Sequence, residues 1–497
     1  MTDTVLHDTA TVMAGHPPAD AARSRYTRER IAHWENLAAR AVPRAAAYYH
    51  RRLAEVYGFL IPPGQRVLEL GCGRGDLLAA LEPAEGVGVD FSPAMIAQAR
   101  ARHPEMRFVV GDAHALEDVL SGPYDAIILS DLVNDLWDVQ GVLEQVRALA
   151  APGTRIVVNA YSRLWEPALA LAERLGLAQP VLYRNWLAPD DVANLLHLTG
   201  FEVIRRWQEV VWPVATPLAD RLCNRYLARL WPFRHLGLAN FFLARPAPGA
   251  PSAGEPAEEP LVSVVVAARN EAGNVPDIFA RVPELGGGTE FVFVEGHSQD
   301  GTYEAIEEAI AAHPERRCQL LRQTGVGKGD AVRAGFAAAR GEVLMILDAD
   351  LTVPPEDLPR FYDALRSGRG EFINGVRLVY PMEREAMRFW NLLGNKFFSL
   401  AFSWLLGQPV KDTLCGTKVL WRKDYERLAA NRSYFGDFDP FGDFDLLFGA
   451  AKLGLRIIDL PIRYRERTYG TTNIDRWRHG WLLLRMVAFA ATRIKFV

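Results

Sequence analysis

The sequence predicts an α/β protein of two domains, each built around a largely parallel β-sheet. The 497 residues are more than one hydrophobic core usually organises. In both halves, short runs of Val, Ile and Leu alternate with longer helical patterns, which is typical of βαβ units. A stretch at 246–260 is rich in Pro, Ala and Glu, a composition that stays extended and solvated. We therefore expect domains at 1–245 and 261–497, a linker between them, and a flexible segment at 1–25.

Composition narrows the classes of function. Apolar residues make up 49% of the chain and charged residues 23%, as in soluble globular proteins. The net charge of -4 supplies no strong field for a polyanion, so we expect no nucleic-acid partner. The start of the chain has no basic and apolar leader pattern, and no run reaches the roughly 20 apolar residues of a membrane span. The four cysteines lie far apart, which indicates neither a zinc site nor a disulfide framework and fits the cytoplasm.

A glycine-rich turn follows the first expected strand of the first half. Gly71, Gly73 and Gly75 stand there, and glycine lets the backbone approach a ligand and adopt positive φ. Asp76 stands where a dinucleotide-binding fingerprint has its third glycine, so NAD is disfavoured. The expected strands of this half are the apolar runs at 67–70, 87–89, 108–110, 126–129 and 156–158.

Carboxylates end the next two strands. Asp90 ends the second, where a carboxylate can accept both ribose hydroxyls of an adenosine, and Asp112 follows the third, beside the expected adenine. Roughly residues 30–245 thus resemble the class I S-adenosylmethionine (SAM)-dependent methyltransferases. The resemblance implies a Rossmann-like sheet and in-line transfer of the SAM methyl group. It also implies that SAM is bound by Glu69, Gly71, Gly73, Gly75, Asp90 and Asp112.

The methyl acceptor is less defined by the sequence. Residues 130–133 lack the Asn/Asp-Pro-Pro-aromatic run of many methyltransferases that act on nucleic-acid bases, so we expect a small molecule, a sugar or a lipid-linked acceptor. Asp131 is interpreted first as a helix cap and second as a base. Tyr161, Arg163 and Trp165 either line the acceptor pocket or pack in the fold. An alternative is that this domain is a non-catalytic SAM-binding or scaffolding module.

The second half contains a pair of carboxylates after a buried strand. Asp348 and Asp350 follow the apolar run at 343–347, and the alternation of a strand places both on one face. Two hard oxygen donors suit Mg²⁺ or Mn²⁺ bridging a diphosphate, where the metal stabilises a departing nucleoside diphosphate. The pair therefore predicts metal-assisted glycosyl transfer.

Polar residues also follow the other strands of this half, expected at 262–267 and 291–294. The glycine run at 325–330 lacks the Gly-x-x-x-x-Gly-Lys-Ser/Thr spacing, so a kinase-type phosphate loop is rejected. The order of these motifs resembles the inverting family-2 glycosyltransferases of the GT-A fold, across residues 261–475. The resemblance implies Asp348 and Asp350 as metal ligands. It also implies that a nucleoside-diphosphate sugar is bound by Asn270, Glu271, Glu295, Ser298, Asp300, Lys328, Asp330 and Asp348.

Later motifs resemble the dolichol- or polyprenyl-phosphate branch of that family. They lie at 375–377, 412–418, 443–445 and 467–473. In that branch, basic residues at the positions of Arg377 and Arg467 grip phosphates. The sequence departs from the branch at Thr352, where a metal-binding Gln is common, and at Asn473, where a Lys is common.

Two amphipathic segments, 386–407 and 476–497, bear on where the acceptor lies. Polar residues recur every three or four positions in the first, between aromatic side chains, as in helices that are mostly buried or lie in a lipid interface. We favour the interface, and so expect a peripheral enzyme on the cytoplasmic face of the membrane.

The expected glycosyl acceptor is a polyprenyl phosphate, which is already an oxyanion near neutral pH and would be held by Arg377 and Arg467. The alternative acceptor is the hydroxyl of a soluble metabolite or glycan. It would need a general base, for which Asp443 and Asp445 are the candidates.

Overall fold

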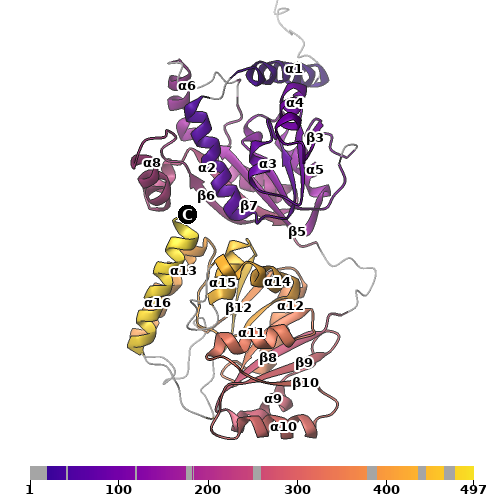
Figure 1. Ribbon diagram of the computed structural model, residues 1–497, viewed down its shortest axis with the longest axis vertical. Coiled ribbons are helices and arrows are strands. Elements are labelled where there is room, and N and C mark those ends of the chain that lie inside the picture. The colour runs from indigo at the N-terminus through magenta and orange to yellow at the C-terminus, as the bar shows by residue number, and fades with distance from the viewer. Residues whose placement is uncertain are drawn as a thin grey trace, which may run out of the picture.

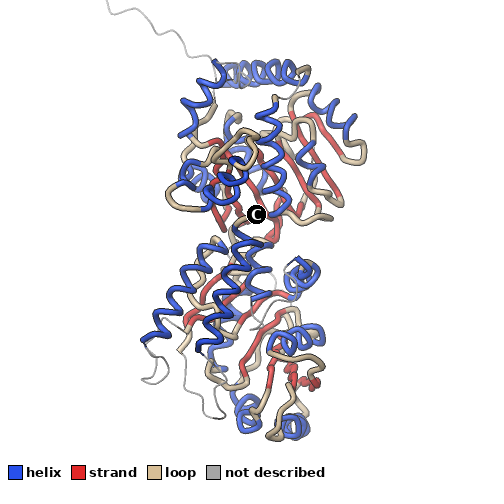
Figure 2. Tube along the Cα trace, turned by 60° about the vertical axis from the view of Figure 1, so that its left-hand side comes forward, coloured by secondary structure: helices blue, strands red, loops and turns tan. Residues whose placement is uncertain are grey.

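The computed structural model contains two α/β domains stacked along the long axis of the molecule (Figure 1). A seven-stranded mixed sheet forms the centre of each domain. Figure 2 shows the strands of both sheets between helices. The residues that the structure describes are 19–40, 43–117, 120–174, 182, 184–249, 259–377, 389–434, 444–463, 469 and 476–497.

The first sheet has the strand order β3-β2-β1-β4-β5-β7-β6. Its first five strands are parallel, whereas β7 runs antiparallel to both of its neighbours. Successive strands are added in one direction from β1 to β3 and in the opposite direction from β4 onward. Ligands of open α/β sheets bind at such a switch point, here between β1 and β4. The strands are β1 Arg66–Leu70, β2 Glu85–Asp90, β3 Arg107–Val110, β4 Tyr124–Ser130, β5 Ala150–Tyr161, β6 Phe201–Glu209 and β7 Ala239–Pro246.

Helices cover both faces of this sheet. Buried side chains of α2, α3 and α4 pack on one face, and those of α5 and α7 pack on the other. The helices are α1 Ala19–Ala38, α2 Arg44–Leu60, α3 Asp76–Ala80, α4 Pro93–Arg102, α5 Val139–Ala148, α6 Glu166–Arg174, α7 Pro189–Leu198 and α8 Ala219–Arg221.

The second sheet has the order β10-β9-β8-β11-β13-β12-β14. Here β13 is antiparallel to β11 and β12, and the remaining pairs are parallel. The carboxyl ends of β8, β9 and β11 therefore meet at one edge of the sheet. The strands are β8 Val262–Ala268, β9 Thr289–Glu295, β10 Arg317–Arg322, β11 Val343–Asp348, β12 Phe372–Val376, β13 Lys418–Trp421 and β14 Ile457–Pro461.

Two hydrophobic clusters sandwich this sheet. Side chains of α11, α13, α14, α15 and α16 form one cluster, and those of α9, α10 and α12 form the other. The helices are α9 Val275–Arg281, α10 Thr302–Ala312, α11 Lys328–Ala338, α12 Leu358–Arg366, α13 Phe389–Leu406, α14 Arg422–Ala430, α15 Phe444–Lys452 and α16 Arg476–Ala490.

The predicted fold class is confirmed, because all eight apolar runs lie inside strands β1–β5, β8, β9 and β11. At the start of the chain, α1 begins at Ala19, inside the segment 1–25 that was expected to be flexible, and Arg23 lies 3.6 Å from the Asp112 carboxylate. The expected flexibility of 1–25 stays a prediction. Residues 250–258 of the expected linker lie outside the described part of the chain.

A buried ion-pair network joins the two domains. The carboxylate of Glu371, which precedes β12, lies 2.9 Å from Arg155 of β5 and 3.4 Å from Arg245 of β7. Arg456 adds a second cross-domain pair with Glu202, at 2.8 Å. Burial alone raises the pKa of Glu371, but the charges of Arg155 and Arg245 hold it below its ordinary value. We refer to Glu371, Arg155 and Arg245 as the Glu371 network.

Helices α13 and α16 lie side by side along the second domain (Figure 1). Each has a buried face in the core, with Phe402 and Met486 fully covered. Each also exposes apolar side chains, among them Phe397, Leu400, Trp481 and Leu484. Within the described residues, no helix is both long and apolar enough to cross a bilayer. The core prediction is therefore confirmed for one face of each helix, and the lipid-interface prediction stays a prediction for the exposed face.

Candidate functional site

The glycine turn after β1 adopts the backbone that the sequence predicts. Gly71, Gly73 and Gly75 have φ values of 71°, 52° and 75°, which side chains rarely tolerate. A Cβ on Gly75 would also lie 2.5 Å from the ring of Phe108. The turn is tied to β2 because the Gly73 N–H donates to the Asp90 carboxylate at 3.0 Å.

Glu69 has an unsatisfied acceptor at the same edge. It lies in β1 with 3% of its surface exposed, and its Oε2 is buried without a hydrogen-bond partner among the described residues. Burial raises the pKa of this carboxyl well above its ordinary value. An unpaired buried carboxylate oxygen costs free energy unless a ligand supplies a donor. The cationic amino group of SAM is a donor of that kind, so the residues present fit this cofactor.

Asp112 stands at the end of β3 as an ionised carboxylate. His114 Nδ1 lies 2.7 Å from it, and this contact, with the nearby charge of Arg23, lowers the Asp112 pKa to about 2. Asp90 differs, because burial raises its pKa. The structure thus places Glu69, Asp90 and Asp112 at the carboxyl ends of three adjacent strands.

Asp131 is not a helix cap, and the interpretation favoured from the sequence is wrong. It precedes a 3₁₀ turn at Leu132–Asn134 with φ 56°, and its side chain makes no cap hydrogen bond. Instead its Oδ1 accepts from the Tyr49 hydroxyl at 2.9 Å and from the Asn159 amide. Burial raises its pKa. A Cβ on Gly71 would touch the Leu132 side chain, so Asp131 lies close to the glycine turn.

Of the three residues suggested for the methyl-acceptor pocket, only Tyr161 joins this cluster. Its ring stacks on Tyr49, with centroids 5.7 Å apart, and Arg184 lies over it at 4.5 Å. Trp165 donates to the Leu236 carbonyl at 2.8 Å, and the Arg163 side chain is 74% exposed. Tyr49, Asn159 and Arg184 were missed because they come from distant parts of the chain with no motif around them.

In the second domain, the loops after β8 and β9 are bound to each other. Asn270, with φ 58°, donates its N–H to Ser298 Oγ at 3.0 Å, and its Oδ1 accepts from the Gln299 N–H at 2.8 Å. The Glu295 carboxylate accepts the Ser298 N–H at 2.5 Å. Asn270, Glu295 and Ser298, three of the residues predicted to bind the sugar nucleotide, therefore form the hydrogen bonds that hold these two loops in place.

Two further predicted residues extend this pair of loops. Asp300 accepts from the Ala272 N–H at 3.2 Å and from Thr302, and the Tyr469 hydroxyl lies 3.3 Å away. Glu271 donates its N–H to Thr302 Oγ1 at 2.9 Å. Together these contacts fix the edge of the sheet beside β11.

Asp348 and Lys328 form an ion pair at the end of β11. Lys328 Nζ lies 2.6 Å from Asp348 Oδ1. Although burial opposes ionisation, the charges of Lys328 and Lys418 lower the Asp348 pKa. Gly416 closes over this pair, since a Cβ at that position would overlap both charged groups. The structure thus brings together the β11 carboxylate, the Lys328 loop and the 412–418 motif.

Asp350 is oriented by Thr352, the residue that stands in place of the usual Gln. Asp350 Oδ1 accepts from the Thr352 N–H at 3.1 Å and from its hydroxyl at 2.8 Å. No group of three or more metal-binding side chains occurs among the described residues. Two carboxylates with oxygen-rich neighbours nevertheless fit Mg²⁺ or Mn²⁺, because such ions keep several water and diphosphate ligands.

Asp330 has a local role in the glycine turn before α11. Its Oδ2 accepts from the Gly325 N–H at 3.1 Å and from Gln323 Nε2 at 2.9 Å. This side chain therefore holds the glycine turn together, while Gly327 stands at the N-terminal cap of α11. Its predicted contact with the sugar nucleotide stays a prediction.

Sequence comparisons agree with this division of the chain. Residues 38–206 match the family described as a methyltransferase domain, and residues 263–428 match glycosyl transferase family 2. The dolichol-phosphate mannosyltransferase of Pyrococcus furiosus is 31% identical over 247 residues, which are 47% of this chain and 67% of the relative. The chain belongs to glycosyl transferase family 2 through its second domain. Its first domain is a methyltransferase domain.

Other relatives extend the comparison. The undecaprenyl-phosphate 4-deoxy-4-formamido-L-arabinose transferase of Aeromonas hydrophila is 35% identical, and the alignment covers 42% of this chain and 61% of the relative. Among solved structures, the SAH-bound magnesium protoporphyrin IX methyltransferase of Synechocystis is 17% identical. It covers 46% of this chain and 100% of its own, with a TM-score of 0.32.

Arg377 of this family-2 glycosyltransferase is held by a carboxylate. Its guanidinium contacts both oxygens of Asp412, at 2.7 and 2.9 Å. Burial raises the Asp412 pKa, but the charge and hydrogen bonds of Arg377 hold it below its ordinary value. The same arginine lies close enough to Asp348 to lower its pKa. It is therefore fixed near Asp348, one of the two carboxylates predicted to bind a metal.

Asp445 lies in a different environment from the Asp348 cluster. Its carboxylate is 3.3 Å from Arg432 and 3.8 Å from Arg333, with 10% of the side chain exposed. A carboxylate between two arginines is a weak base, because the positive charges favour its ionised form. Asp443 and Arg467, the remaining predicted catalytic residues, lie outside the described residues.

Proposed function

We propose that the second domain transfers a sugar from a nucleoside-diphosphate sugar to a polyprenyl phosphate, with inversion at the anomeric carbon. The observation that carries this proposal is the arrangement of Asp348, Lys328 and Gly416, with Asp350 two residues along. Asp348 and Asp350 would hold Mg²⁺ or Mn²⁺, which neutralises the charge that develops on the leaving diphosphate. The names of the Pyrococcus and Aeromonas relatives support the class of acceptor.

The chain's own residues prepare this site. Lys328 and Lys418 keep the Asp348 carboxylate ionised, so it is ready to bind a cation. The Thr352 hydroxyl and N–H fix Asp350. Lys328 also brings a positive charge within reach of the donor phosphates, where it favours departure of the nucleoside diphosphate.

The pairing of Asp445 with two arginines supports a phosphate acceptor, which needs no general base. A polyprenyl phosphate, whose second pKa is about 6, carries a nucleophilic oxyanion at neutral pH and needs no base. Arg377, fixed by Asp412, would orient this group. The exposed apolar side chains of α13 and α16 fit a protein that lies on the cytoplasmic face of a membrane to reach its lipid-linked acceptor.

The test is to incubate the purified protein with Mg²⁺ or Mn²⁺ and a panel of sugar nucleotides, with and without polyprenyl phosphate. Release of nucleoside diphosphate should require the lipid phosphate and fall at least about a hundredfold in Asp348→Asn. Asp357→Asn, which alters an exposed pair with Arg360, is the matched control. Equal release with a water-soluble hydroxyl acceptor would favour the soluble-acceptor alternative, and no release with any donor would reject the proposal.

We further propose that the first domain binds SAM and methylates a small molecule, a sugar or a lipid-linked acceptor. Glu69 Oε2 would accept a donor of the cofactor, and Asp90 would face its ribose. Calorimetric titration with SAM should show binding that Glu69→Gln weakens by about tenfold, because one charge-assisted hydrogen bond is lost. The Glu85→Gln variant, on the far end of β2, should bind normally. Absence of binding by the unaltered protein would contradict the proposal.

Asp131 would face the methyl acceptor in this scheme. It lies beside the glycine turn, and burial raises its pKa, which suits a base that takes a proton from the acceptor. Asp131→Asn should keep SAM affinity while losing methyl transfer to components of a cell extract. Binding of SAM by the unaltered protein without any methyl transfer would instead favour a non-catalytic module.

A further inference from the structure

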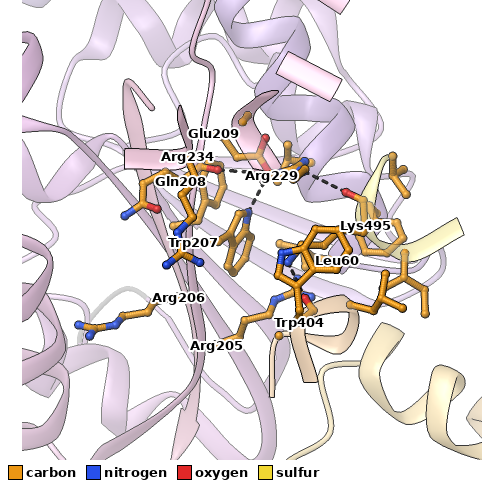
Figure 3. Close-up of a pocket in the computed structure, with 18 of the residues that line it drawn as sticks. Leu60, Arg205, Arg206, Trp207, Gln208, Glu209, Arg229, Arg234, Trp404 and Lys495 are labelled. Atoms are coloured by element: carbon orange, nitrogen blue, oxygen red, sulfur yellow. Dashed lines mark hydrogen bonds and ion pairs between the residues drawn. The ribbon is translucent and has the colours of Figure 1, made fainter. Parts of the chain in front are cut away.

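A large cavity lies between the two domains, away from both sites described above. It measures about 1250 Å³ and is bounded by α2, β6, β7 and residues 219–235 of the first domain, and by α13 and residues 494–497 of the second. Figure 3 shows Arg205, Trp207 and Glu209 entering it from β6, opposite Trp404 and Lys495. Both domains therefore contribute to one binding surface.

Cations outnumber carboxylates around this cavity. Four carboxylates line it, and two of its arginines, Arg52 and Arg229, share one of them, Glu209. Ten arginine and lysine side chains line it, namely Arg51, Arg52, Arg205, Arg206, Arg221, Arg225, Arg229, Arg234, Lys411 and Lys495. Such an excess of like charge destabilises a folded protein unless an anion offsets it.

Arg205 is the clearest sign of a missing partner. Its Nε is buried without a hydrogen-bond partner, and its guanidinium forms no ion pair with any residue that the structure describes. It stacks 4.3 Å from the Trp207 ring and packs over Gly407, where a Cβ would collide with it. Burial and the neighbouring Arg229 lower the Arg205 pKa to about 10, while the charge of Glu209 acts in the opposite direction. A guanidinium held rigid with unused donors is suited to a phosphate.

A second arginine repeats the pattern. The Arg225 Nε is also buried without a partner, and no described carboxylate pairs with its side chain. Aromatic and aliphatic side chains occupy the wall between the cations, among them Trp207, Trp404 and Leu60. Leu400, which lines the cavity, is 73% exposed on the outer face of α13. The cavity thus combines a cationic centre with an apolar exit.

We propose that this cavity binds the phosphate group of an amphiphilic phosphomonoester, whose organic chain leaves along the apolar wall toward α13. The site is separate from the transfer site, and its occupation does not require a sugar nucleotide or a metal. Because the ligand contacts both domains, its binding should also strengthen the contact between them.

Lys495 gives the binding an expected pH dependence. Its Nζ donates to the Trp404 carbonyl at 2.7 Å. Burial, together with the charges of Arg205, Arg229 and Arg234, lowers its pKa to about 7, while Glu209 acts in the opposite direction. A bound phosphate would favour the protonated ammonium, so binding should take up protons near neutral pH.

The experiment measures binding of inorganic phosphate and of octyl phosphate to the full-length protein, by calorimetry without metal or sugar nucleotide and at constant ionic strength. Octyl phosphate should bind tighter than inorganic phosphate and raise the melting temperature. Arg205→Met should weaken it at least about tenfold, since two or more charge-assisted hydrogen bonds are lost. Arg102→Met, an exposed arginine of α4 that pairs with Asp76, should bind as the unaltered protein does.

Further experiments distinguish a lipid phosphate from free phosphate, and a second variant guards against an effect of misfolding. Flotation with phosphatidylcholine vesicles, with and without polyprenyl phosphate, should show phosphate-dependent association that Arg205→Met reduces. Inorganic phosphate binding as tightly as octyl phosphate would retain the phosphate site and reject the apolar exit. The proposal would be overturned if Arg205→Met and Arg225→Met, both folded, bound octyl phosphate as tightly as the unaltered protein does. Absence of binding by the unaltered protein would also overturn it. Asp348→Asn should bind octyl phosphate normally, so failure of glycosyl transfer leaves this result unaffected.

Discussion

At the contact between the two domains, buried arginines have a carboxylate partner in one region and none in another. In the Glu371 network, Arg155 and Arg245 share one carboxylate, and their side chains are only 6% and 4% exposed. A short way along the same contact, Arg205 and Arg225 have no carboxylate partner among the described residues. In the first arrangement each guanidinium has a carboxylate partner, although the Arg155 Nε is also buried without a hydrogen bond among the described residues. The second resembles half of an ion pair, and we infer that the other half comes from a phosphate.

This difference teaches that charge at an interface can serve either assembly or binding. A carboxylate placed opposite Arg205 would stabilise the domain contact, but it would exclude an anionic ligand. Glu209, the buried acid nearest to the cavity, is already shared between Arg229 and Arg52 at 2.5 and 3.7 Å. Removing charges from each region should therefore change stability in opposite directions.

The largest effect is expected for Glu371→Ala. Loss of this carboxylate leaves Arg155 and Arg245 buried without their shared partner, which costs about 3–5 kcal/mol in comparable sites. Chemical unfolding should show a correspondingly lower free energy of unfolding, and limited proteolysis should cleave faster between the domains. Glu356→Gln, which breaks an exposed pair with Arg281, is the control and should cost less than about 1 kcal/mol. Similar losses of unfolding free energy in Glu371→Ala and Glu356→Gln would show that the buried network contributes no more to stability than an exposed ion pair.

The next effect concerns pH and Lys495. Its pKa is about 7 in the folded protein against an ordinary value of 10.5, so between these limits the unfolded chain binds more protons. Stability should therefore rise with pH in this window, by up to about 1.4 kcal/mol per unit from this group. The free energy of unfolding, followed from pH 7 upward, should show a shallower rise in Lys495→Met. Parallel curves for the two proteins would contradict the assignment.

A smaller effect, an increase in the free energy of unfolding, is expected for Arg205→Met in the absence of ligand. Methionine keeps much of the packing on Trp207 and Gly407 and removes a buried charge that repels Arg229. The melting temperature should rise, with a gain of about 1 kcal/mol in the free energy of unfolding. A large loss of stability in differential scanning fluorimetry would show that the guanidinium has a structural partner, and the contrast with the Glu371 network would fail.

Arg206→Met should have the smallest effect of all. Arg206 follows Arg205 on β6, but its side chain is 57% exposed and pairs with Asp190 at the surface. An exposed pair of this kind changes stability by less than about 1 kcal/mol. Urea unfolding should place this variant within error of the unaltered protein. A stability change as large as that of Arg205→Met would contradict the expectation that the buried arginine affects stability more than its exposed neighbour.

The sequence predicted the fold well because its signals were local. Each apolar run is short and followed by motif residues, so β1–β5, β8, β9 and β11 could be placed from the chain alone. The antiparallel strands β7 and β13 were not predicted, since nothing near them in sequence shows which strand they pair with. Helix α1 was missed because its composition is polar, and its contact with the rest of the domain, such as that of Arg23 with Asp112, joins residues distant in sequence.

The sites could be predicted only where a motif carries the chemistry. Asp348 and Lys328, predicted from two separate motifs, lie in contact in the structure, and their binding of a sugar nucleotide stays a prediction. Asp131 was given the wrong first interpretation, because its partners Tyr49 and Asn159 are distant in sequence. The cavity between the domains had no signal at all, since no motif marks Arg205 as part of a site.

The last described residues of the chain bear on how the molecule unfolds. Arg229 donates to the Lys495 carbonyl and Arg52 to that of Val497, each at 2.9 Å, so the end of the second domain is bound to the first. The chain also connects the two sheets between β7, which ends at Pro246, and β8, which begins at Val262. Together with the Glu371 network, these links at separate points oppose independent melting. Calorimetry should therefore record one cooperative transition for both domains, and separately expressed halves should each melt at a lower temperature.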